Sequence, residues 1–275
     1  LFDFLMSGYL YSHTAFREKL EKPIVKSKNP EASAQLRRLV QPFLLRRRKA
    51  EVLKELPPKE EYVRRISLSE EERKPYGACV QATVEKLDGE QGKLQILAAL
   101  TRLRQICCDP NLCFENYDGA TSKLDACMEL VTAAVEGGHR ILLFSQFTSM
   151  LELLAKRLDE AGVSHFTLQG STPKPVRAEL VRRFNSGEAD VFLISLRAGG
   201  TGLNLTAADI VIHYDPWWNV AAQNQATDRA YRIGQRNPVQ VYKLIAQDTI
   251  EEKIVELQQA KQDLAETVTG SARSC

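Results

Sequence analysis

The segment ADVFLISLRAGGTGLNLTAADIVIH, residues 189–213, contains two short apolar runs separated by a glycine-rich stretch. The run 191–195 is apolar at nearly every position, so a strand built from it would be buried on both faces. Gly199, Gly200 and Gly202 follow closely and allow backbone conformations that turn N–H groups towards an anion. Open parallel sheets bind ligands at loops of this kind, where a buried strand ends.

The same alternation of strand and helix patterns extends to both sides of this segment. Short apolar strands interspersed with amphipathic helices predict right-handed βαβ units on a parallel sheet covered on both faces. Strand patterns occur at 140–144, 163–168, 189–195, 210–213 and 239–246, and helix patterns at 122–136, 149–161, 176–184, 219–233 and 249–265.

Composition and predicted secondary structure divide the chain into four regions. Residues 1–59 are helical and basic and end in two prolines, and 60–120 read as a helical protrusion that starts with a strand-like run at 61–68. In that protrusion, Ser69 and Glu72 form a capping-box pattern. Residues 121–248 hold the alternating pattern, and 249–275 form a C-terminal helix and tail. The expected fold class is α/β, a doubly wound parallel sheet flanked by helices, with an N-terminal helical insertion region.

Composition excludes several classes of protein. A net charge of +2 is too small for a uniformly basic nucleic-acid binder, so any DNA contact must come from a local patch. No apolar run reaches the length of a membrane span, so we expect no membrane partner. The six cysteines form no C-x-x-C pair, so we expect reduced thiols and no metal site. The chain opens in an apolar stretch without a start Met, and we expect it to be a fragment.

Two arginines are the strongest functional signal. Arg229 and Arg232 are three residues apart within the predicted helix 219–233, so both should share one helix face, directed to the rim where the strands end. Two guanidiniums on one face suit a polyphosphate, because their planar donors match phosphate oxygens. The alternative is a solvated helix face with paired charges.

Polar residues also follow two other predicted strands. Ser145 and Gln146 come directly after the strand at 140–144, and Gly170 and Ser171 follow the strand at 163–168. Hydroxyls, amides and helix-start N–H groups at such junctions suit contacts with a phosphate backbone. Taken singly, the first pair reads equally as a helix cap and the second as a turn.

The nucleotide-binding loop G-x-x-x-x-G-K-[ST] does not occur in the sequence. An acidic pair after an apolar strand, which would hold magnesium, is not present in it either. If the arginine pair contacts a nucleotide, the loop that binds the phosphates must therefore lie on another segment or another molecule.

These residues resemble the SWI/SNF-type (Snf-family) ATP-dependent DNA translocases of helicase superfamily two. The segment 42–59 is similar to the one that links the family's two lobes, and 103–110 resembles the end of its helical protrusion. Residues 141–150, 195–209 and 215–235 are similar to helicase motifs IV, V and VI, the last being highly specific. The chain thus resembles a second RecA-like lobe, and its short helical insert is more typical of a bacterial member.

The resemblance implies a role for each matching residue. The catalytic group would be the arginine fingers Arg229 and Arg232, with Gln225 ordering the cleft. Gly200, Gly202, Asn204 and Asp228 would lie at the nucleotide, and Ser145, Gln146, Gly170, Ser171, Ser195, Arg197 and Trp217 along the DNA.

The resemblance also implies ligands and partners. ATP with Mg²⁺ would be held mainly by a first RecA-like lobe that this sequence lacks, so we expect the chain alone to be inactive. The partners would be double-stranded DNA and that first lobe. The location would be the cytoplasm, at the bacterial nucleoid, or the nucleus in a eukaryote.

Two other functions are compatible with parts of the sequence. A non-enzymatic DNA-binding or protein-docking module could retain the fold of a helicase lobe. A doubly wound protein could bind a dinucleotide at Gly199–Gly202, but the loop lacks the G-x-G-x-x-G register at a first βα turn.

Overall fold

The computed structural model describes residues 2–43, 56–87, 93–196, 198 and 202–269. Contacts divide the chain into two units, 1–54 with 256–275 and 55–255, and each has its own apolar core. Among the described residues, no helix combines the length and the apolar character needed to cross a membrane.

The smaller unit is helical. Its N-terminal part contains short helices around a core of Leu20, Ile24 and Ala32. Asn29 caps the longest of them, because its side-chain oxygen accepts hydrogen bonds from the backbone N–H groups of the first turn. The elements are α1 (Phe2–Leu5), α2 (His13–Phe16), the π-helix η1 (Arg17–Glu21), α3 (Lys22–Ser27), α4 (Pro30–Val40) and the 3₁₀-helix η2 (Gln41–Phe43).

The larger unit is built on a six-stranded sheet with the order β1-β6-β5-β2-β4-β3, and every neighbouring pair is parallel. This confirms the predicted α/β fold class. The strands are β1 (Lys59–Ile66), β2 (Ile141–Ser145), β3 (His165–Leu168), β4 (Val191–Ser195), β5 (Ile210–His213) and β6 (Val239–Ala246).

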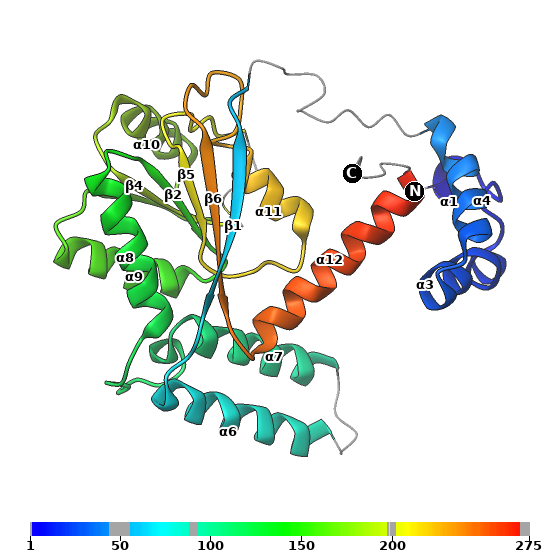
Figure 1. Ribbon diagram of the computed structural model, residues 1–275, viewed down its shortest axis with the longest axis horizontal. Coiled ribbons are helices and arrows are strands. Elements are labelled where there is room, and N and C mark those ends of the chain that lie inside the picture. Colours follow the sequence, from blue (N-terminus) through cyan, green and yellow to red (C-terminus); the bar gives the residue numbers. More distant parts are fainter. Residues whose placement is uncertain (1, 44–55, 88–92, 197, 199–201, 270–275) are drawn as a thin grey trace. The chain divides into compact units, whose positions relative to one another are not determined.

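Alternate residues of the central strands enter two different cores. Leu143 and Leu193 pack under α8 (Ser122–Glu136) and α9 (Thr148–Glu160), whereas Phe144 and Phe192 pack under α10 (Lys174–Ser186) and α11 (Val220–Thr227). Figure 1 shows the sheet between these two helix layers. The all-apolar strand segments arise because both faces of each strand are buried.

β1 differs from its predicted place. The strand-like run at 61–68 was assigned to the helical protrusion, but β1 pairs with β6 over eight residues, from Lys59 to Ile66. The edge position explains its mixed composition, because six of its eight residues, 59–63 and Arg65, are exposed.

After β1 the chain forms the helical hairpin of α6 (Glu70–Leu87) and α7 (Lys93–Cys108), followed by η3 (Pro110–Leu112). The predicted capping box is confirmed: Glu72 N donates to Ser69 Oγ at 3.2 Å, and Ser69 N donates to Glu72 Oε2 at 2.8 Å. The last helix, α12 (Ile250–Thr269), starts after β6.

Candidate functional site

The arginine pair lies beyond the end of α11. We predicted a helix over 219–233, but α11 stops at Thr227 and Arg229 and Arg232 lie in turns. The carbonyl groups that would continue the helix have other donors. Arg229 O accepts from Leu205 N at 3.1 Å, and Ala230 O accepts from Gln235 Nε2 at 3.2 Å. Arg229 O is therefore bonded to the segment before β5, and Ala230 O to a side chain five residues further along the chain.

These contacts also place the pair at the opposite edge of the sheet from the one expected. Gln235 Nε2 donates to Ala208 O at 2.7 Å, just before β5 begins. α11 leaves the carboxyl end of β5 and runs back along it, and a helix of 8 residues spans about 12 Å, the length of a short strand. Arg229 and Arg232 consequently lie near the amino ends of β5 and β6, so the expectation that they face the carboxyl rim was wrong.

The two arginines have different environments. Arg229 is 5% exposed, and its Nε is buried without a hydrogen-bond partner among the described residues. Burial, and then the positive charge of Arg232, lower the pKa of Arg229. Arg232 itself is exposed. A buried, incompletely paired guanidinium next to a second cation is a site that an anion would stabilise.

The predicted nucleotide residues cluster around this point only in part. Asn204 precedes Leu205, which bonds to Arg229 O, and Asp228 caps the end of α11. Gly202 has a φ of +50°, and a Cβ at that position would meet open space. Gln225 is exposed on α11, and Gly200 lies outside the described residues.

Those of the predicted DNA residues that the structure describes lie at or after the carboxyl ends of β2, β3, β4 and β5, at the carboxyl edge of the sheet. Gly170 and Ser171 are exposed there, and Ser195 is 2% exposed. Trp217 is half-buried after β5, and Arg197 lies outside the described residues. Arg229 and Arg232 thus lie at the opposite edge of the sheet from Gly170 and Ser171.

Ser145 and Gln146 are held by an internal carboxylate. Ser145 is fully buried, and its hydroxyl donates to Asp215 Oδ1 at 2.7 Å. Gln146 donates to the same carboxylate through its backbone N, at 3.2 Å to Oδ1, and its Nε2, at 2.5 Å to Oδ2. In this conformation the Ser145 hydroxyl faces the interior, and only the half-buried Gln146 can present polar atoms outwards.

Arg177 joins two of the candidate DNA loops. Its guanidinium donates to the carbonyl groups of Thr172 at 2.8 Å, Gly170 at 2.9 Å and Ala198 at 3.2 Å. One side chain therefore fixes the backbone after β3 to the backbone after β4. Sequence reasoning missed Arg177, although a cation directly after a polar turn was a usable signal.

His213, the last residue of β5, is a buried base outside the predicted site. It is 1% exposed, stacks on Phe144, and its Nε2 lies 2.9 Å from Thr227 Oγ1. Burial lowers the pKa of His213 to about 3. The side chain is therefore neutral in the folded protein at any physiological pH.

We predict an acid-dependent loss of stability from His213. Its folded pKa is about 3, so below the unfolded pKa of about 6.5 only the unfolded state gains a proton. At pH 5 this favours unfolding by about 2 kcal/mol relative to pH 7. Urea unfolding of the parent and of His213→Gln at both pH values measures the effect. An equal loss in the two proteins would assign the acid sensitivity to other groups.

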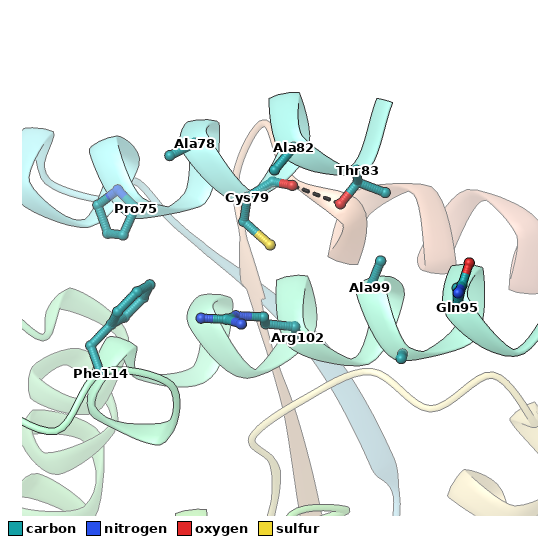
Figure 2. A pocket seen from close by; sticks show the side chains of 10 residues that line it. Pro75, Ala78, Cys79, Ala82, Thr83, Gln95, Ala99, Arg102 and Phe114 are labelled. Carbon is teal, nitrogen blue, oxygen red and sulfur yellow. Dashed lines mark hydrogen bonds between the residues drawn. The ribbon is translucent and has the colours of Figure 1, made fainter. Parts of the chain in front are cut away.

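A separate pocket of about 630 Å³ lies between α6 and α7. Figure 2 shows its lining side chains on the two neighbouring helices, with Arg102 extending towards Phe114, whose ring centroid is 5.6 Å from the guanidinium carbon. Its lining includes small residues of both helices and none of the predicted site residues. Within the described part of the chain, no group of three or more His, Cys, Asp or Glu side chains is arranged to hold a metal ion.

Comparison with known proteins assigns the chain to a class. Residues 1–112 match the SNF2-related domain, and residues 122–234 match the helicase conserved C-terminal domain. The SWI2/SNF2 ATPase C-terminal domain of Sulfolobus solfataricus is 30% identical with a TM-score of 0.63, over 74% of this chain and 86% of that one. The chain belongs to the SWI/SNF-type family of helicase proteins.

Two longer relatives cover nearly all of the chain. YwqA of Bacillus subtilis, whose name describes an ATP-dependent helicase/translocase, is 42% identical over 98% of this chain. The Sulfolobus solfataricus SWI2/SNF2 ATPase core, solved in complex with double-stranded DNA, is 33% identical with a TM-score of 0.67, over 98% of this chain and 58% of that one. The chain spans about a third of the length of YwqA, 31%.

Proposed function

We propose that this chain is the second RecA-like lobe of an ATP-dependent translocase on double-stranded DNA, and that it supplies arginine fingers to ATP held by a first lobe. The observation that carries the proposal is the buried Arg229 guanidinium, whose Nε has no partner among the described residues, beside the exposed Arg232. A phosphate group would satisfy the first and neutralise both.

In this proposal the two tasks of such a lobe belong to opposite edges of the sheet. The arginine pair lies near the amino ends of β5 and β6, and Gly170, Ser171 and Gln146 lie where the strands end. In this proposal the first lobe brings ATP with its Mg²⁺ to the arginine pair, which stabilises the charge that develops on the transferred phosphoryl group. The carboxyl edge meanwhile contacts the DNA backbone, so nucleotide-driven movement between lobes shifts the chain along the duplex.

Binding of a short duplex by the chain tests the DNA half of this proposal. Contacts to phosphates release counterions, so with roughly three such contacts the affinity should fall roughly 40-fold between 50 and 200 mM salt. Fluorescence anisotropy with a labelled duplex measures this slope. An affinity that does not change with salt would contradict contact with the DNA backbone.

A charge substitution locates the contact. Ser171→Asp places a carboxylate at the exposed turn after β3 and should weaken duplex binding about tenfold by repelling phosphate. Ser186→Asp is the matched control, since Ser186 is exposed at the opposite end of α10. Equal affinity of the two variants would remove the carboxyl edge as the DNA face.

A further inference from the structure

The helical hairpin α6–α7 is joined to the sheet by a buried arginine. Arg104, in the last turns of α7, is 4% exposed, and its Nη2 donates to Pro216 O at 2.6 Å. The guanidinium carbon lies 5.7 Å from the ring centroid of Phe147 and 5.5 Å from that of Trp218. The guanidinium is thus fixed by contacts with two aromatic rings and by a hydrogen bond at its end.

The same guanidinium approaches the carboxylate that holds the segment after β2. Arg104 Nη2 is 3.8 Å from Asp215 Oδ2, and both side chains are buried. Asp215 accepts three hydrogen bonds from Ser145 and Gln146. Burial raises the pKa of Asp215, while the hydrogen bond from Ser145 and the positive charges of Lys123 and Arg104 oppose that rise. Arg104 therefore helps to keep a purely accepting carboxylate in place.

The ionised carboxylate determines how Gln146 is oriented. A carboxylate accepts only, so the Gln146 amide must direct its nitrogen to Asp215. A protonated aspartate or an asparagine at 215 would carry a donor of its own, directed at the donors of Ser145 and Gln146. Two donors cannot bond to each other, so at least one of the three hydrogen bonds would be lost. The outward face that Gln146 presents thus depends on the charge at 215.

We propose that Arg104 is a positioning residue for DNA binding, which orients Gln146 through the buried carboxylate of Asp215 and so couples the helical hairpin to the DNA-facing segment. This inference rests on the proposed DNA contact at the carboxyl edge. A second hydrogen bond joins the hairpin to the segment after β5, because Tyr214 Oη donates to the carbonyl of Cys108, one turn further along α7, at 2.8 Å.

Arginine suits this position better than other cations. Its plane can contact Phe147 and Trp218 while one edge bonds to Pro216 O. Lysine would keep the positive charge near Asp215 but would lose the planar contacts. The charge and the packing can therefore be separated by substitution.

Duplex affinity at pH 8 and pH 6, measured by anisotropy at one salt concentration, tests the inference. Arg104→Met keeps the apolar stem and removes the charge, so we expect about tenfold weaker binding at pH 8. The loss should be larger at pH 6, because burial raises the pKa of Asp215 and the variant removes one of the positive charges that oppose that rise. Arg104→Lys should restore most of the affinity and the parent pH profile. Arg102→Met is the matched control, since Arg102 is exposed on the same helix, and it should bind like the parent.

Thermal unfolding of each variant confirms that it is folded. The pH dependence of duplex affinity depends on the charges around Asp215. The titratable groups that act on Asp215 are Arg104 and Cys108 of α7, Lys123 of α8 and Glu251 of α12.

Asp215→Asn provides an independent variant if Arg104→Met does not fold. It fixes position 215 in a neutral state, so binding should be about tenfold weaker than that of the parent, with no added pH dependence. Parent-like affinity and pH profile in Arg104→Met, or parent-like affinity in Asp215→Asn, would overturn the role of Arg104. Failure of the parent chain to bind duplex would instead contradict the proposed function.

Discussion

Arg232→Ala, in a two-lobed protein that joins this chain to the proposed first RecA-like lobe, is expected to lower DNA-stimulated ATP turnover by about 10³-fold. Arginine fingers contribute about 10³–10⁵ to the rate of phosphoryl transfer, because they stabilise charge that develops only in the transition state. Arg229→Ala should cause a loss of the same order. Arg229→Lys should recover only part of it, since lysine lacks the planar pair of donors.

Steady-state turnover with saturating duplex measures this effect, and thermal unfolding checks that each variant is folded. Arg236→Ala is the matched control, because Arg236 is exposed in the same connection between α11 and β6. Turnover close to that of the parent in both Arg229→Ala and Arg232→Ala would show that this pair does not act on ATP.

Lys123→Met is expected to destabilise the larger unit by about 3–5 kcal/mol. Lys123 is 1% exposed and Glu251 is completely buried, and Lys123 Nζ donates to both oxygens of Glu251, at 2.7 and 2.6 Å. Burial alone would lower the pKa of Lys123, but the Glu251 carboxylate outweighs burial and raises it. Removal of the lysine leaves a buried carboxylate that, among the described residues, still accepts a hydrogen bond from Ala246 N, at 2.8 Å.

Urea unfolding at pH 7 measures the cost. The double variant Lys123→Met/Glu251→Leu should recover much of the lost stability, since removal of both charges also removes their desolvation penalty. Arg182→Met breaks the exposed pair with Glu179 and should leave the free energy of unfolding unchanged. A Lys123→Met protein as stable as the parent would contradict a structural role for the buried pair.

The fold could be predicted from the sequence because the hydrophobic pattern that specifies each strand and helix lies within that element. Strands such as β2 and β4 are continuous apolar runs between helices with caps and glycine stops, and this pattern permits few arrangements other than a parallel sheet covered on both faces. The edge strand β1 was harder to assign, because an exposed strand carries charged residues and does not show the buried pattern.

The geometry of the site depended on contacts between distant segments. Leu205 N donates to Arg229 O, a carbonyl group that would otherwise have continued α11, and no local pattern predicts this bond. The Ser145 hydroxyl faces inwards because Asp215, 70 residues away, requires donors. Residue types alone therefore did not indicate which polar atoms the interior would use, and the phosphate contacts that they suggest stay a prediction.

We propose that this chain completes an ATP site whose phosphate-binding loop lies on another lobe. The most direct measurement is ATP turnover by the isolated chain and by the joined two-lobed protein, each with and without duplex DNA. We expect negligible turnover by the chain alone, and turnover by the joined protein that increases when duplex is added. DNA-stimulated hydrolysis by the isolated chain would contradict this proposal, and a joined protein that binds duplex without hydrolysing ATP would favour a non-enzymatic DNA-binding module.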